Sequence, residues 1–212
     1  MTASDTMRGR FVTLEGIEGV GKSTNVEFVR DQIEAAGHRV IVTREPGGTA
    51  LAERIRHVVL TATGETVPPV CELLLMFAAR SAHVNNRIRP ALEDGVWVVC
   101  DRFTDATVAY QGFGRRADLD KIGALADWVH GDIWPDLTLL LDAPVEIGLS
   151  RVQKRGKPDR IESERAAFFN RVREGYLSLA DRHPERIVKV DASESLGLVR
   201  PQRQDAQRPR VG

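Results

Sequence analysis

A glycine-rich segment near the N-terminus carries the clearest chemical signal in the sequence. In order, its residues are Gly16, Ile17, Glu18, Gly19, Val20, Gly21, Lys22, Ser23 and Thr24. Glycines let backbone N–H groups turn inward around phosphate oxygens, and the N-terminus of a following helix attracts negative charge. Lys22 is able to reach the outer phosphates as a point charge, and the hydroxyl of Ser23 is a ligand for Mg²⁺. The segment therefore predicts a P-loop that binds a nucleoside triphosphate with Mg²⁺.

A second chemically suggestive pair, Asp101 and Arg102, directly follows an apolar run. Asp101 suits the role of a Mg²⁺ ligand, either directly or through water. A structural ion pair or a helix N-cap would use the same residues, so the pair alone leaves both interpretations open. The P-loop also leaves the fate of the terminal phosphate open, because GTPases, ATPases, regulators and small-molecule kinases share it.

The elements that position these residues are short strands alternating with helices. Apolar, largely β-branched runs predict buried strands, and they are Phe11 to Leu14, Val40 to Val42, Val96 to Cys100, Leu137 to Leu141 and Ile187 to Val190. Helical patterns lie between them, among them Ser23 to Ala36 and Val70 to Glu93. This alternation predicts parallel strands with right-handed helical crossovers. We expect a doubly wound α/β three-layer sandwich with a five-stranded parallel sheet and with ligands beyond the carboxyl ends of the strands.

The length and composition of the chain favour a single domain. The chain has 212 residues, of which 42% are hydrophobic, and its 30 Lys and Arg residues balance 30 Asp and Glu residues. This balance argues against a nucleic-acid partner, and no apolar run approaches the roughly 18 residues of a membrane helix. Cys71 and Cys100 fit no disulfide framework and are expected to be reduced core residues. We expect a cytoplasmic protein without membrane contact, with a domain over residues 10–196 and disordered tails over 1–9 and 197–212.

Further motifs resemble the bacterial thymidylate kinase family. The resemblance covers about residues 10–192 and rests on Leu14-Glu15-Gly16, Arg44 to Thr49, Asp101-Arg102-Phe103, Tyr110-Gln111-Gly112 and Asp159-Arg160-Ile161-Glu162. It implies a P-loop nucleoside-monophosphate kinase that uses Mg²⁺ to transfer the γ-phosphoryl of ATP to dTMP, and it implies a homodimer. Two alternatives stay open, namely another nucleoside-monophosphate kinase and a P-loop regulator that uses the nucleotide as a switch.

The resemblance also implies roles for residues on the acceptor side. Arg44 and Arg102 would approach the phosphate of the acceptor nucleotide, and Arg80 would hydrogen-bond the thymine ring. Glu15 would lie near the acceptor sugar and the reacting phosphates. Tyr110 would crowd the 2′ position of the sugar, so that deoxyribose is preferred.

An aromatic side chain stacks on the base in this family, and Phe77 is our candidate for it. Many members carry the aromatic four residues before the arginine, where this chain has Met76, whereas Phe77 lies three residues before Arg80. Offsets of three and four share a helix face, so Phe77 remains suitable. The other acceptor residues expected from these motifs and their spacing are Pro46, Thr107 and Gln111.

A basic stretch over about residues 151–163 resembles the lid of a nucleotide kinase. Arg151 and Arg155 are spaced to share a helix face. Alone, such a run is typical of a solvated surface. Because the P-loop carries Glu18, where some family members have an arginine, the resemblance places the catalytic cations in the lid, with Arg151, Arg155 and Arg160 as candidates.

Phosphoryl transfer to a monophosphate needs no catalytic base, because the second pKa of a phosphate is about 6 and the attacking oxygen is largely anionic. We expect catalysis to depend on aligning two nucleotides and on neutralising charge. The expected catalytic residues are Lys22, Arg102, Glu15 and the lid arginines.

Overall fold

The sheet of the computed structural model has five strands in the order β2-β3-β1-β4-β5. Residues 8–61, 66–155, 159–162 and 164–193 are described, apart from the side chain of Arg155. The strands are β1 (Phe11–Glu15), β2 (Val40–Arg44), β3 (Trp97–Asp101), β4 (Leu137–Asp142) and β5 (Ile187–Asp191). Every neighbouring pair is parallel. The predicted doubly wound fold with a five-stranded parallel sheet is therefore confirmed.

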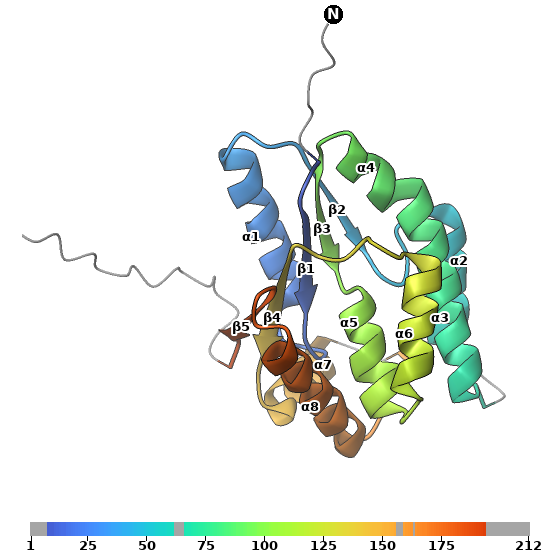
Figure 1. Ribbon diagram of the computed structural model, residues 1–212. Helices are drawn as coiled ribbons and strands as arrows, with labels where there is room; N and C mark the ends of the chain where they lie inside the picture. Colours follow the sequence, from blue (N-terminus) through green and yellow to red (C-terminus); the bar gives the residue numbers. More distant parts are fainter. Residues whose placement is uncertain (1–7, 62–65, 156–158, 163, 194–212) are drawn as a thin grey trace, which may run out of the picture.

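Helices cover both faces of this sheet (Figure 1). Within the described residues they are α1 (Lys22–Ala35), α2 (Ala50–Thr61), α3 (Pro69–His83), η1 (Val84–Ile88), α4 (Arg89–Glu93), α5 (Thr104–Thr107), η2 (Val108–Gly114), α6 (Leu119–Val129), α7 (Val145–Arg155) and α8 (Ala166–Arg182). Successive side chains of a strand point to opposite faces. Val12 and Leu14 of β1 accordingly pack with α1, whereas Phe11 packs on the other face with η1 and α4.

The helical stretch expected over Val70 to Glu93 consists of α3, η1 and α4, which follow one another without a break. The middle segment, η1, is π-helical, and the N–H of Arg89 donates to the carbonyl of Val84. Pro90 lacks a backbone N–H and cannot continue the ordinary ladder, which accounts for a wider turn at this point. A second π-helix, η2, follows β3 and α5, and it carries the Tyr110-Gln111-Gly112 motif.

Each strand extends at least one residue beyond the end expected from its apolar run, and its last residue is polar. These last residues are Glu15, Arg44, Asp101, Asp142 and Asp191. Backbone pairing continues through them, for example between Arg44 and Asp101, because ladder hydrogen bonds do not depend on side-chain hydropathy. The parallel strands thus deliver charged side chains to one edge of the sheet.

Two expectations about burial are wrong. Cys71 is exposed on α3, whereas Cys100 is buried in β3 as expected. The edge strands β2 and β5 are only partly buried, and Val188 of β5 is 47% exposed, because an edge strand has a neighbour on one side only.

The expected tails fall mostly on residues 1–7 and 194–212, which lie outside the described residues. At the start of the described chain, Arg8 lies 3.7 Å from Asp136 and the N–H of Gly9 donates to the carbonyl of Leu92. No helix in the described part of the chain is both long and apolar enough to cross a bilayer. The extent of the domain and of the lid stays a prediction.

Candidate functional site

The P-loop connects the end of β1 to the start of α1 at the carboxyl edge of the sheet. Gly19 has a φ of 75°, and a Cβ there would lie 2.1 Å from the carbonyl oxygen of Gly148 in α7. Only glycine fits this conformation and this close approach. Lys22 donates from Nζ to the carbonyls of Gly16 at 3.1 Å and Ile17 at 2.8 Å. Partial burial and the charge of Arg102 lower the pKa of Lys22 to about 8.

The cavity beside this loop, here called the P-loop cavity, collects most of the residues expected to bind ATP. Those that line it are Glu18, Gly19, Gly21, Lys22, Ser23 and Thr24. Ile17 and Val20 pack in the hydrophobic core instead, and Gly16 contributes its carbonyl to Lys22. Arg44 and Asp101 also line this cavity.

A buried oxygen in the P-loop cavity is suited to a metal ion. Oδ1 of Asp101 is buried and accepts no hydrogen bond from the described residues. Ser23 lines the same cavity. Hydroxyl, carboxylate and phosphate oxygens are the ligands that Mg²⁺ prefers. Ser23 and Asp101 therefore fit the expected metal site.

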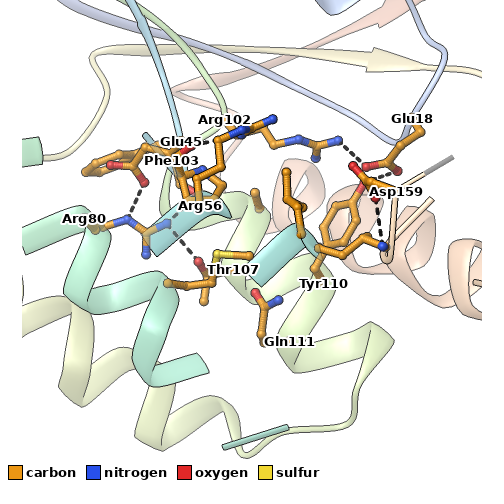
Figure 2. A pocket seen from close by; sticks show the side chains of 15 residues that line it. Glu18, Glu45, Arg56, Arg80, Arg102, Phe103, Thr107, Tyr110, Gln111 and Asp159 are labelled. Carbon is orange, nitrogen blue, oxygen red and sulfur yellow. Dashed lines mark hydrogen bonds and ion pairs between the residues drawn. The ribbon is translucent and has the colours of Figure 1, made fainter. Parts of the chain in front are cut away.

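A second cavity, here called the Arg80 cavity, adjoins the first (Figure 2). The expected acceptor residues that line it are Pro46, Arg80, Arg102, Thr107, Tyr110 and Gln111. Figure 2 shows Arg80 and Thr107 at one end of this cavity and Glu18 and Asp159 at the other. Glu18, Glu45, Arg56, Arg102 and Asp159 line both cavities. The two cavities thus share a charged wall.

Arg80 is buried at the far end of its cavity and is held by three acceptors, one directly after β2 and two at the start and end of α5. Its Nε donates to Glu45 at 2.7 Å, and its Nη2 donates to Thr107 at 2.9 Å and to the carbonyl of Phe103 at 3.2 Å. Burial by itself would raise the pKa of Glu45, but the charge of Arg80 and a hydrogen bond from His83 lower it below its ordinary value. Nη1 of Arg80 is buried and has no partner among the described residues. One guanidinium nitrogen is therefore available for a ligand.

Arg102 lies where the two cavities meet. Its φ is 72°, a conformation that L-residues rarely adopt and that is concentrated at functional sites. Nη2 donates to Glu18 at 2.8 Å and Nη1 donates to the hydroxyl of Tyr176 at 3.0 Å. The guanidinium carbon lies 4.7 Å from the ring centre of Tyr110, whose hydroxyl donates to Glu18 at 2.5 Å. Glu18, Tyr110 and Tyr176 together fix the direction of this guanidinium.

Glu15 lies behind Arg102 and lines neither cavity. It is fully buried and accepts from the N–H of Phe103 at 2.7 Å and from the hydroxyl of Tyr176 at 2.8 Å. Burial raises the pKa of Glu15 to about 8. Glu18, three residues later, is one of the carboxylates that line both cavities. The place near the acceptor sugar that the resemblance implies for Glu15 stays a prediction.

Met76, and not Phe77, lines the Arg80 cavity. Phe77 packs in a buried cluster with Leu73 of α3 and Ile122 of α6, while its ring lies beneath the guanidinium of Arg80 at 4.9 Å. Neighbouring helical residues differ by about 100° in direction, and this difference turns Phe77 toward α6. The side chain expected to face a base therefore supports Arg80 from below.

Of the three arginines expected in the lid, the two with described side chains occupy different places. Arg151 lines the P-loop cavity and donates to the carbonyls of Ala192 and Ser193. Arg160 lines neither cavity, and it donates from Nη2 to Glu72 at 2.6 Å. The side chain of Arg155 lies outside the described residues, as do Gly156 and Pro158.

The approach of Arg44 to an acceptor phosphate stays a prediction. Arg44 lines the P-loop cavity and not the Arg80 cavity, and its Nη2 pairs with Glu53 at 3.0 Å. Several lining residues were not singled out from the sequence, namely Glu45, Arg56 and Asp159. Glu45 and Asp159 belong to the motifs quoted above, whereas Arg56 carries no local signal.

Comparison with known proteins gives consistent matches along most of the chain. A family model described as Thymidylate kinase matches residues 14–202. The thymidylate kinase of Alkalilimnicola ehrlichii is 57% identical over 193 residues, which covers 91% of this chain and 89% of that relative. The thymidylate kinase of Chromohalobacter salexigens is 58% identical over 193 residues, which covers 90% of this chain and 91% of that relative. The crystal structure of thymidylate kinase from Ehrlichia chaffeensis matches with a TM-score of 0.72 at 33% identity, covering 86% of this chain and 93% of that chain.

Glu15→Gln tests the neutral, buried state of this carboxyl group. The pKa of Glu15 rises from an ordinary 4.5 to about 8 on folding, so between these pH values the native protein holds a proton that the unfolded chain has released. The free energy of unfolding of the wild type should consequently fall as the pH rises through this window. An amide does not titrate, so the variant should lose less stability over the same range. Denaturant titrations at several pH values measure this, and parallel curves for both proteins would contradict it.

Proposed function

Because the chain belongs to the thymidylate kinase family, we propose that the P-loop cavity binds ATP with Mg²⁺ and that the Arg80 cavity binds dTMP. The enzyme transfers the γ-phosphoryl of ATP to dTMP, giving dTDP and ADP for dTTP biosynthesis. The supporting observation is the wall of five residues that line both cavities. Two nucleotides placed on either side of this wall have their phosphates directed at Arg102.

On the ATP side, the P-loop N–H groups and Lys22 bind the phosphates. Nζ of Lys22 now donates to P-loop carbonyls, and the phosphates would take over as its acceptors. Ser23 and Asp101 would hold Mg²⁺, which when bound neutralises charge on the phosphate oxygens. Arg151 lines the same cavity and is the described lid arginine placed to add positive charge there.

On the acceptor side, the polar groups select a pyrimidine that carries a carbonyl group at position 4, where cytosine carries an amine. The unpartnered Nη1 of Arg80 is a donor, and a thymine carbonyl oxygen accepts from it, whereas the exocyclic amine of cytosine does not. Thr107 already fixes the other side of this guanidinium. Tyr110 lies between Arg80 and Glu18 along the cavity wall (Figure 2), where its ring crowds the sugar and favours deoxyribose.

Phosphoryl transfer needs no catalytic base, and catalysis depends on aligning the two nucleotides and on neutralising the charge of their phosphates. Arg102 lies at the junction of the cavities and neutralises charge that spreads over the equatorial oxygens in the transition state. Glu18 keeps Arg102 and Tyr110 in place through both of its oxygens. We propose that Glu18 takes the position near the acceptor sugar that the resemblance implied for Glu15, and that Glu15 acts behind Tyr176.

The exposed apolar side chains on three adjacent helices support a homodimer. α2 packs beside α3 and α3 packs beside α6. The large apolar side chains exposed on them are Leu51, Val58, Val70, Leu74, Leu119 and Trp128. Apolar patches of this kind mark interfaces between proteins.

We expect sedimentation at micromolar concentration to give twice the chain mass, and a species with the mass of one chain throughout would contradict this assembly.

The proposed location is the cytoplasm, where ATP and deoxynucleotides are present and where free thiols persist. Cys71 is exposed and Cys100 is buried, and both are free. An exposed free thiol is compatible with a reducing compartment.

The acceptor specificity tests the proposed reaction. The protein is mixed with ATP and Mg²⁺, and ADP formation is followed without an acceptor and then with dTMP, dUMP, CMP or AMP. We expect rapid ADP formation with dTMP, slower formation with dUMP, and little with CMP or AMP, because of the donor offered by Arg80. Equal ADP formation with and without an acceptor would overturn the proposal in favour of an ATPase or a nucleotide switch.

Lys22→Ala tests the phosphate site. Loss of this cation should lower kcat/KM by a factor of about 10² to 10³, the usual effect of removing one preorganised donor at a reacting group. The exposed Lys189, which pairs with Asp181 on the surface, provides the control, and Lys189→Ala should retain full activity. Steady-state kinetics with dTMP measure both variants, and circular dichroism checks their folding. Near-normal turnover of Lys22→Ala would remove Lys22 from the mechanism.

A further inference from the structure

A buried carboxylate with no part in the reaction as described above lies on α3. The side chain of Glu72 is 2% exposed, and Glu72 lines neither cavity. Oε1 accepts from Nε2 of Gln111 at 2.8 Å and from Nε of Arg115 at 3.3 Å. Oε2 accepts from Nη2 of Arg160 at 2.6 Å and from Nη2 of Arg115 at 3.4 Å. Glu72 thus joins two separate segments of the chain to α3, namely η2 with its C-cap residue Arg115 and the turn that carries Arg160.

The cluster around Glu72 is balanced in charge. Burial would raise the pKa of Glu72, but hydrogen bonds from Gln111 and Arg160 and the charge of Arg115 lower it below its ordinary value. The second positive charge is met by Glu164, whose Oε1 lies 2.6 Å from Nη1 of Arg115. Burying charged groups is costly unless all of them are paired. Such a cluster holds its members in one arrangement, because each alternative leaves a buried charge without a partner.

Arg160 connects this cluster to the walls of the cavities. Its Nε donates to the carbonyl of Val59 at 2.7 Å, so α2 holds it as well as α3. The residues on either side face the substrates, since Asp159 lines both cavities and Ile161 lines the Arg80 cavity. Oδ1 of Asp159 accepts from the N–H groups of Ile161 and Glu162, both at 2.8 Å. These hydrogen bonds make residues 159–162 a compact turn that includes Arg160.

Gln111 is held at the other end of the cluster. It is buried on η2 and lines the Arg80 cavity, next to Tyr110. One carboxylate therefore determines the position of the turn at 159–162 and of a residue in the wall of the Arg80 cavity.

We propose that Glu72 is a positioning residue that fixes the turn 159–162 and Gln111 against the acceptor, and that Arg160 acts through Glu72 and not on the transferring phosphoryl group. This inference rests on the proposed function, because it assigns the Arg80 cavity to dTMP. Without the contact between Glu72 and Arg160, the turn at 159–162 no longer closes the Arg80 cavity. Acceptor binding then weakens, and water competes with dTMP for the phosphoryl group.

The test measures ADP and dTDP separately in wild type, Glu72→Gln, Arg160→Gln and the double variant. In each single variant we expect the KM for dTMP to rise about tenfold, the usual loss for one hydrogen bond to a charged group. The KM for ATP should be unchanged, and the ratio of ADP to dTDP should rise above one. The double variant should be no worse than the more severe single variant, because both remove the same contact.

Arg186→Gln is the matched control. It breaks another arginine–carboxylate pair, in which Arg186 donates to Asp105 at 2.6 and 2.9 Å, and Arg186 lines neither cavity. It should lower the Tm while leaving the KM for dTMP and the product ratio at wild-type values. Arg160→Gln also covers the case in which Glu72→Gln fails to fold, because Glu72 then still pairs with Arg115.

The outcomes separate the two proposals. A wild type that makes no dTDP would overturn the proposed function. An active wild type with a lower Tm but an unchanged KM and product ratio in Arg160→Gln would overturn the positioning role. A fall in kcat alone for Arg160→Gln, additive with Glu72→Gln, would also overturn it and make Arg160 a catalytic residue.

Discussion

The mutual repulsion of two sets of phosphates is the constraint on which a site for two nucleotides depends, and we propose that Arg102 supplies the charge that meets it. A guanidinium in that position has to be oriented before substrates arrive, since reorganising it during the reaction would add to the barrier. Glu18 from the P-loop and Tyr176 from α8 orient it, and Glu15 at the end of β1 holds Tyr176. The site therefore needs β1, β3 and α8 in their observed places.

Much of the fold was accessible from the sequence because hydropathy and glycine placement are local signals. Apolar runs located each of the five strands in the described residues, and the glycine-rich segment located the loop between β1 and α1. The last residue of each strand was harder to predict. A charged residue such as Asp101 or Asp142 still pairs through its backbone, although its side chain does not belong to the apolar run. The exposure of Cys71 shows the same limit, because an isolated apolar residue does not reveal which side of a helix is covered.

Within the site, small differences in sequence position accompany large differences in the direction of the side chain. Phe77 and Met76 are neighbours, yet one packs against α6 and the other lines the Arg80 cavity. Glu15 and Glu18 are separated by a turn of the P-loop, which places one inside the core and the other between the cavities. The proposed roles of Arg160 and Glu72 depend on a contact between two residues that are 88 positions apart in the chain. Local sequence spacing carries no information about such a pair.

The unpartnered nitrogen of Arg80 has a consequence for the evolution of the protein. A buried donor left without an acceptor costs about 1 to 3 kcal/mol, and Nη1 of Arg80 has no acceptor among the described residues. Substitutions that fill or neutralise this position would be favoured by selection for stability alone. Retaining the arginine instead trades stability for discrimination, because a base that lacks the matching oxygen leaves the cost unrelieved. Under the proposed assignment, the selectivity comes from a desolvation cost at Nη1 of Arg80 that the correct base removes and a wrong base leaves in place.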